Sequence, residues 1–230
     1  MKEADDLGAY RLRTERFAYR SFSAAITLPE SSEELIDEGE FGADERLPYW
    51  AELWPSARAL ARAILDREHL PARALELGAG LGLPSLALLR RGVDVLATDY
   101  YAEALRFARY NARHNRLPTL RTLHLDWRDP DRLSDRFPLV VAADVLYEPR
   151  NVDALVTLLP AIVGPESSFL LADPGRLHLA EFLRRMTSAG WQVDSLGDRL
   201  EPSPAGNGIG ITVKLLELVP PVSAHEAPNL

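Results

Sequence analysis

The sequence predicts an α/β protein with a Rossmann-like, doubly wound sheet of seven strands, mostly parallel with one antiparallel strand near the C-terminus. Short apolar runs alternate with longer helix-like stretches along residues 73–189, which is typical of a parallel sheet covered by helices on both faces. Glycines recur at every second position just after the first apolar run. The last two runs, 192–196 and 209–218, have no helical stretch between them, which predicts the antiparallel strand.

The other strands are expected at 73–77, 93–98, 120–125, 139–143 and 168–172, where short apolar runs indicate buried strands. Helices are expected at 84–91, 101–115, 152–162 and 177–189, and one more includes Leu60 and Ile64 before the first strand. Pro84 suits a first helical turn, and Gly190 is a common helix stop. These elements alternate as the predicted fold requires.

Three segments are expected along the chain. Residues 1–47 form an N-terminal appendage on the substrate side, with a hairpin near 17–28 and a loop, and residues 48–218 form the α/β domain. Residues 219–230 are rich in proline and polar residues and are expected to be a loose tail. The polar turn between the last two strands is placed at 202–208.

Composition narrows the possible classes of protein. The chain has 230 residues, 47% of them hydrophobic, which fits one globular domain. It has no apolar run of 18 residues, so no membrane span is expected. An N-terminus without an apolar signal core and a chain without cysteine suit the cytoplasm. A net charge of −8 argues against a nucleic-acid partner, and the five histidines show no metal-ligand spacing, so no metal is expected. We expect a monomer.

The glycine-rich turn at 76–82 predicts a ligand site. A dinucleotide-binding turn needs the pattern G-x-G-x-x-G, but the third position falls on Leu83 or Ser85. The pattern present is acidic-x-G-x-G-x-G, formed by Glu76, Gly78, Gly80 and Gly82. It resembles the cofactor loop of class I S-adenosylmethionine-dependent methyltransferases, which implies that the acidic residue faces the amino-acid portion of that cofactor. A purely structural glycine turn is the alternative.

Residues at the next two strand ends suit the rest of such a ligand. Asp99 ends the second strand, about 20 residues beyond the turn, where a carboxylate can accept hydrogen bonds from both ribose hydroxyls. Tyr100, beside it, is assigned to the same cofactor site. After the third strand, Asp126 can accept from an adenine amino group and Trp127 can pack on the ring. The alternatives are a helix cap for Asp99 and a cover for the sheet edge for Trp127.

Two further stretches carry a family resemblance. Trp54-Pro55-Ser56-Ala57 resembles the W-P-x-[AG] segment of the seven-β-strand lysine methyltransferases (methyltransferase family 16). Residues 48–55 are similar to the methyltransferases of the electron transfer flavoprotein β subunit. Residues 144–147 match the D-x-x-Y signature after the fourth strand, and residues 173–176 also match that branch. The resemblance covers roughly residues 48–215.

The resemblance implies roles for particular residues. S-adenosylmethionine would be the cofactor, Trp54 and Ala143 would contact it, and Asp144 and Tyr147 would face the target nitrogen of a protein substrate. We hypothesise that Asp144 attracts and orients an amine by hydrogen bonding, while Tyr147 offers a ring face or hydroxyl. The alternative is that Asp144 caps the next helix and Tyr147 packs against the sheet.

The acceptor is the least determined part. Enzymes that methylate adenine N6 or glutamine amides carry N-P-P-[YF] where this chain has Asp144-Val145-Leu146-Tyr147, which argues against those acceptors. The sequence therefore favours an N-methyltransferase acting on a protein lysine, with the electron transfer flavoprotein β subunit as a candidate. A small-molecule N-methyltransferase (amine or nicotinamide-like) and a non-catalytic cofactor-binding protein remain alternatives.

Overall fold

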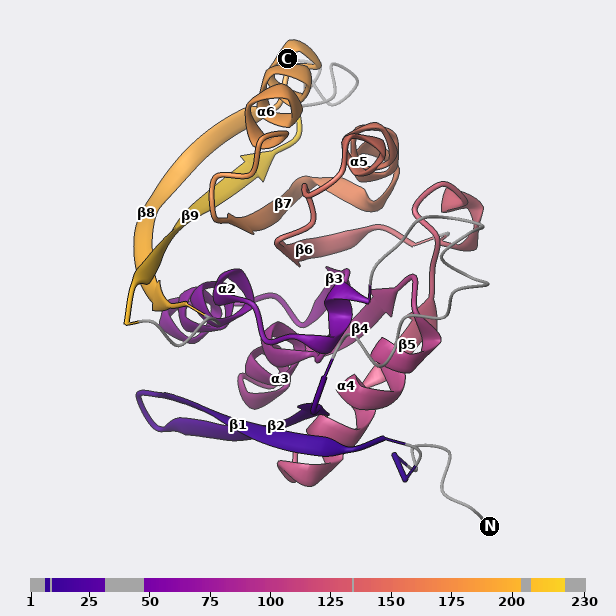
Figure 1. Ribbon diagram of the computed structural model, residues 1–230. Coiled ribbons are helices and arrows are strands. Elements are labelled where there is room, and N and C mark those ends of the chain that lie inside the picture. The colour runs from indigo at the N-terminus through magenta and orange to yellow at the C-terminus, as the bar shows by residue number, and fades with distance from the viewer. Residues whose placement is uncertain (1–6, 9, 32–47, 134, 204–207, 222–230) are drawn as a thin grey trace.

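A seven-stranded sheet forms the centre of the molecule, with the strand order β5-β4-β3-β6-β7-β9-β8 (Figure 1). The computed structural model describes residues 7–8, 10–31, 48–133, 135–203 and 208–221. Strands β3 to β7 pair in parallel, and β9 runs antiparallel to both of its neighbours, β7 and β8. The predicted fold class is therefore confirmed. The strands are β3 Arg73–Leu77, β4 Asp94–Asp99, β5 Arg121–His124, β6 Phe137–Ala143, β7 Val163–Asp173, β8 Gln192–Pro202 and β9 Gly210–Val219.

Helices cover both faces of this sheet. One buried apolar cluster joins the sheet to α2, α3 and α4, and a second joins its other face to α5 and α6 (Figure 1). None of the helices within the described ranges has the length and apolarity that a membrane crossing requires. The helices are α2 Pro55–Asp66, α3 Leu83–Arg90, α4 Ala102–His114, α5 Pro149–Ile162 and α6 Leu179–Ser188.

The N-terminal hairpin lies against α4 rather than beside the sheet. Strands β1 (Leu12–Tyr19) and β2 (Phe22–Pro29) pair antiparallel. Asn111 of α4 accepts from the Thr27 N–H at 2.8 Å and donates to its carbonyl at 3.0 Å, and Asn115 does the same for Ala25, at 2.8 Å in each direction. Side chains from α4 and from the residue that follows it thus satisfy backbone groups of β2 that an edge strand would otherwise leave unpaired.

The hairpin is longer than the sequence predicts, because β1 begins at Leu12 rather than near Phe17. The first residues of β1 are mostly polar and only partly buried, so they carry no apolar alternation. The loop expected before residue 48 falls mainly on residues 32–47, and the expected tail falls mainly on residues 222–230; both lie outside the described residues. The placement of the appendage on the substrate side stays a prediction.

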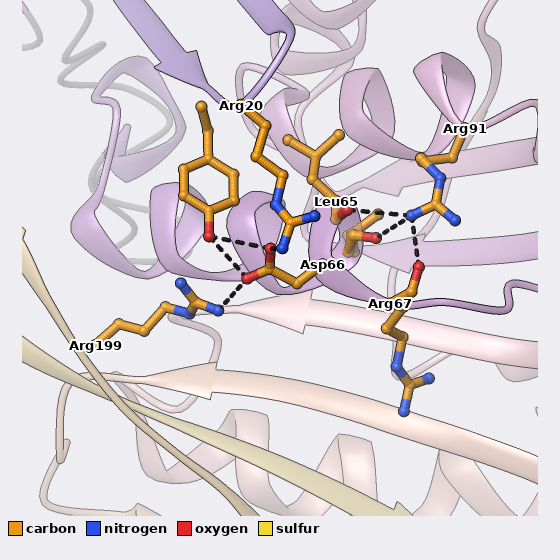
Figure 2. A network of polar contacts seen from close by, with 8 residues as sticks. Arg20, Leu65, Asp66, Arg67, Arg91 and Arg199 are labelled. Carbon is orange, nitrogen blue, oxygen red and sulfur yellow. Dashed lines mark hydrogen bonds and ion pairs between the residues drawn. The ribbon is translucent and has the colours of Figure 1, made fainter.

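Asp66, at the end of α2, joins three parts of the chain (Figure 2). Its carboxylate accepts from the Tyr19 hydroxyl at 2.9 Å and pairs with Arg20 at 2.6 Å and with Arg199 of β8. Burial raises the pKa of Asp66, but the hydrogen bonds from Tyr19 and Arg199 outweigh this and hold it below its ordinary value. Nearby, Arg91 donates to the last carbonyls of α2, which no helical N–H satisfies.

Strand β8 continues to Pro202, six residues beyond the predicted end at Leu196. Gly197 interrupts the pattern with a φ of +94°, at a shift in the register with β9. The polar residues that follow, such as Asp198, still pair with β9 although they do not alternate with apolar residues. Of the turn expected at 202–208, residues 204–207 lie outside the described residues.

Candidate active site

A cavity opens at the carboxyl ends of β3, β4 and β6, where ligands bind in open α/β sheets. All twelve site residues predicted from the sequence line it: Trp54, Glu76, Gly78, Gly80, Gly82, Asp99, Tyr100, Asp126, Trp127, Ala143, Asp144 and Tyr147. These residues come from positions that lie up to 93 residues apart in the chain, from Trp54 to Tyr147. The fold therefore brings together the whole predicted set.

The glycine turn is constrained by the protein around it. Gly78 has a φ of +66°, and a Cβ placed there would lie 3.1 Å from Val145 Cγ1. Gly82 has a φ of +84°, and its Cβ would lie only 2.8 Å from the Cβ of Ala108 on α4. Close approach of a ligand is one reason for glycine in such a turn. The first constraint on Gly82 is instead the close packing of α4, combined with its left-handed backbone.

Glu76 is buried where β3 meets the turn, with 1% of its surface exposed. Its Oε2 accepts a hydrogen bond from the Ser85 hydroxyl in the first turn of α3. Burial raises the pKa of Glu76 to about 8, against the lowering effect of two Ser85 hydrogen bonds, and the Asp99 carboxylate adds to the rise. A cationic ligand group in the cavity would favour the ionised form of this carboxyl.

Asp99 connects the glycine turn to α4. Its Oδ2 accepts from the Gly80 N–H and its Oδ1 from the Tyr101 N–H, both at 2.9 Å. Burial raises the pKa of Asp99, while these backbone hydrogen bonds lower it. The residue at the N-cap position of α4 is Tyr101, not Asp99. The carboxylate thus fixes the shape of the turn at the cavity wall.

The two residues near the end of β5 that line the cavity, Asp126 and Trp127, differ in their hydrogen bonding. Arg128 donates to Asp126 with its backbone N–H and with its guanidinium, at 2.6–2.9 Å. An adenine amino group would therefore share Asp126 with Arg128. Trp127 lies beside Gly78, and its indole N–H is buried with no hydrogen-bond partner among the described residues. A buried donor without a partner is costly and suits a site that a ligand acceptor completes.

Asp144 follows β6 with a φ of +58°, which is uncommon for a residue other than glycine. It is 7% exposed, and its Oδ1 accepts from Arg176 Nε at 2.7 Å. Its Oδ2 is buried and has no hydrogen-bond partner among the described residues. The residue at the N-cap position of α5 is Glu148, so the alternative that Asp144 caps this helix is wrong.

Tyr147 belongs to an aromatic cluster at the cavity wall. Its ring meets the ring of Tyr49 at 5.2 Å between centroids, and Tyr49 meets Trp54 at 6.1 Å, both edge-on. The Trp54 indole N–H donates to the Tyr49 carbonyl at 2.7 Å. The Arg176 guanidinium lies over the Trp54 ring, 5.6 Å from its centroid. Tyr147 therefore contacts cavity residues, rather than packing only against the sheet.

Arg176 and Tyr49 are two site residues to which the sequence assigned no role. The family resemblance includes the stretch Asp173-Pro174-Gly175-Arg176, but the role of Arg176 becomes clear only from its contacts. Asp173 Oδ1 accepts from the backbone N–H groups of Gly175 and Arg176, at 2.7 Å each. This turn presents the Arg176 side chain to Asp144.

The polar groups of the cavity suit S-adenosylmethionine. Within the described ranges, no group of three or more His, Asp or Glu residues is arranged to hold a metal. The cavity instead offers a buried acid (Glu76), a second acid at the end of β4 (Asp99) and the unpartnered indole of Trp127. These groups match the ammonium, ribose and adenine parts of that cofactor.

Two solved methyltransferases share this fold. Magnesium protoporphyrin IX methyltransferase from Synechocystis, solved with bound S-adenosylmethionine, aligns with a TM-score of 0.56 at 16% identity, over 72% of this chain and 78% of that one. The ribosomal protein L11 methylase from Lactobacillus delbrueckii aligns with a TM-score of 0.51 at 21% identity, over 69% and 75%. The fold is therefore that of the Rossmann-like, class I methyltransferases.

The sequence identifies the family within this class. The profile of the lysine methyltransferase family matches residues 49–189, which is more than half of the chain. The chain belongs to the lysine methyltransferase family, and the resemblance predicted from its W-P and D-x-x-Y segments is confirmed.

Characterised relatives act on two kinds of protein side chain. The electron transfer flavoprotein beta subunit lysine methyltransferase of Xenopus laevis is 32% identical over 140 residues, which are 58% of this chain and 55% of the relative. The human histone-arginine methyltransferase METTL23 is 29% identical over 152 residues, which are 63% and 75%. The match spans about half the length of the flavoprotein-directed relatives.

Proposed function

We propose that this protein is an S-adenosylmethionine-dependent N-methyltransferase that acts on a lysine side chain of a protein. The observation that carries the proposal is the buried Asp144 Oδ2, a hydrogen-bond acceptor without a partner in the cavity wall. Membership of the lysine methyltransferase family supports it. An electron transfer flavoprotein β subunit is the first substrate to test, because several relatives act on it.

The strand ends of the first half of the sheet would hold the cofactor. Glu76 would face its ammonium group, Asp99 its ribose hydroxyls, and Trp127 its adenine ring. When bound, S-adenosylmethionine supplies an electrophilic methyl group on a sulfonium. Tyr100 and Trp54 would close the cavity around it, since both line the wall.

The ends of β6 and β7 would hold the acceptor. Asp144 would accept a hydrogen bond from the acceptor nitrogen through Oδ2, because Oδ1 is engaged by Arg176. The Tyr147 and Tyr49 rings would contact the aliphatic part of a lysine side chain. Such positioning of two reactants can contribute ~7–11 kcal/mol to a displacement reaction.

Incubation with radiolabelled S-adenosylmethionine and a lysate of the source organism tests this function. Label in a protein band, lost on protease treatment, is the expected result. Label confined to small molecules would favour a small-molecule N-methyltransferase, and amino-acid analysis of the band separates methyl-lysine from methyl-arginine. The variant Asp144→Ala should abolish labelling while S-adenosylhomocysteine binding, measured by calorimetry, changes by no more than a few-fold. Binding without labelling of any kind would favour a non-catalytic protein.

A further inference from the structure

Two acids and one arginine meet at the acceptor end of the cavity. Ala143 and Ala172 lie opposite each other in the parallel pair of β6 and β7, so the next residues, Asp144 and Asp173, end adjacent strands side by side. Arg176 links them, since its backbone N–H donates to Asp173 and its side chain to Asp144. Each acid keeps one buried oxygen, Oδ2, without a hydrogen-bond partner among the described residues.

A carboxylate beside the nitrogen that accepts the methyl group both attracts the amine and opposes its loss of a proton. A lysine amine has an ordinary pKa of about 10.4 and must lose its proton before its nitrogen can attack. A carboxylate without a counter-ion favours the ammonium form, which has no lone pair to react. The same Asp144 that attracts the acceptor would therefore oppose its activation.

Resting on the proposed function, we propose that Arg176 is a positioning residue that resolves this conflict: it neutralises Asp144, so that the bound acceptor amine gives up its proton. Arg176 occupies Oδ1 and leaves Oδ2 to accept from the acceptor N–H. The nitrogen is then held by the carboxylate while the nearby guanidinium charge disfavours its ammonium form. The proton released passes to solvent, and the neutral nitrogen forms its new bond to the methyl carbon as the sulfur–carbon bond breaks.

The surroundings leave Arg176 able to exert this effect. Its hydrogen bond to Asp144 raises the pKa of the guanidinium further above a value already outside the physiological range, so it stays charged. Burial raises the pKa of Asp173, while the hydrogen bonds from the backbone N–H groups of Arg176 and Gly175 lower it. Among the described residues, other charged or titratable groups near this end include Tyr49, Glu52 paired with Arg13, Tyr147, and Glu148 paired with Arg150.

The pH dependence of methylation tests this role. Initial rates of label transfer to the lysate protein band, at saturating S-adenosylmethionine, would be measured from pH 6 to pH 10 for the parent protein and for Arg176→Met, Arg176→Lys and Arg150→Met. Arg150 lines the same cavity but pairs with Glu148, so it is the matched control. Glu76 also titrates in the cavity, but it is common to all four proteins and does not affect the differences between them.

We expect the acidic limb of the Arg176→Met profile to move to higher pH by about 1–3 units, with rates approaching those of the parent at the alkaline end. Arg176→Lys should keep the limb of the parent because it keeps the charge, and Arg150→Met should not move it. Calorimetry with S-adenosylhomocysteine reports whether each variant is folded and binds. A rate lowered equally at every pH would mean a structural role and overturn the inference. No label from the parent protein at any pH would overturn the proposed function itself, and this inference with it.

Discussion

Glu76 and Ser85 form a hydrogen bond between the end of β3 and the first turn of α3, in the interior of the protein. This contact places an acid with a pKa of about 8 at the start of the glycine turn. In the cofactor-free protein at high pH, ionisation of this buried carboxyl lowers the stability of the fold. In the complex, the ionised carboxyl is the expected partner of a cationic ligand group. The first prediction separates these two effects.

Cofactor-free protein should lose stability as the pH rises from 4.5 towards about 8, because the folded state keeps the Glu76 proton that the unfolded chain releases near 4.5. The variant Glu76→Gln removes this dependence. Its melting temperature relative to the parent should therefore be higher at pH 8.5 than at pH 5. Thermal unfolding at both pH values is the measurement, with the exposed Glu68→Gln as the control. If the difference in melting temperature between the variant and the parent is the same at pH 5 and at pH 8.5, the assigned pKa is contradicted.

The same variant should bind the cofactor product more weakly. Loss of a hydrogen bond to a charged group costs about 1.5–3 kcal/mol, which is roughly a 10- to 150-fold loss of affinity. Calorimetry with S-adenosylhomocysteine at pH 8 measures it. Affinity within two-fold of the parent would remove Glu76 from the ligand site.

Asp99→Asn should also weaken S-adenosylhomocysteine binding, by roughly 10-fold or more. An amide cannot accept as strongly from ribose hydroxyls, and its NH₂ group faces one of the backbone N–H groups of Gly80 and Tyr101 that the carboxylate now satisfies. Asp94→Asn is the control, since Asp94 lies exposed at the other end of β4. Equal effects of the two substitutions would mean a loss of stability in the strand rather than of a ligand contact.

Gly82→Ala should destabilise the fold by about 1–3 kcal/mol, since its Cβ would meet Ala108 at 2.8 Å. For a chain of this size this corresponds to a fall of several degrees in melting temperature. Gly92→Ala is the matched comparison, because Gly92 also has a positive φ but has open space around its Cβ position. The second substitution Ala108→Gly should restore part of the loss at Gly82, and a failure to do so would remove α4 as the cause.

Asp66→Asn should loosen the contact of the hairpin with α2 and β8. The pKa of Asp66 is lowered in the folded protein, so its stabilising effect is present above the ordinary value of 3.8 and is lost as the pH falls through the folded value. The variant should be less stable than the parent at pH 7, and the two should converge at strongly acidic pH. Asp198→Asn, on the exposed part of β8, serves as control in the same unfolding experiment. A constant difference across that range would mean that the charge is not the cause.

The central sheet could be predicted because its strands are buried. Strand β6 reads as an apolar run, β3 places Ala74, Leu75 and Leu77 in the core, and Gly78 and Gly82 mark the turn at the end of β3. The predictions stopped early where structure depends on partners distant in the sequence. The start of β1 and the end of β8 carry polar residues whose partners lie far along the chain. Arg13 pairs with Glu52, 39 residues away, and Arg199 pairs with Asp66, 133 residues away.

The sequence predicted which residues line the candidate site, but not which arginine side chains pair with its acids. The strand ends identified Asp99 and Asp126 as cavity residues, the family resemblance identified Asp144, and all three line the cavity. That Arg128 engages Asp126 and Arg176 engages Asp144 depends on side-chain geometry. No sequence spacing encodes these two pairings.

Asn111 of α4 and Asn115, which follows this helix, complete the backbone hydrogen bonds of β2, and this affects how the protein can be divided. The stretch shared with the family begins at residue 49, yet Phe17, Ile26 and Leu28 of the hairpin are buried in the same apolar cluster as α3 and α4. A fragment cut at the start of the shared stretch would leave that face of α4 open to water. The stretch shared with the family is therefore smaller than the part of the chain that we expect to fold as one unit. Helix α4, which starts beside Asp99, connects the hairpin to the shared stretch.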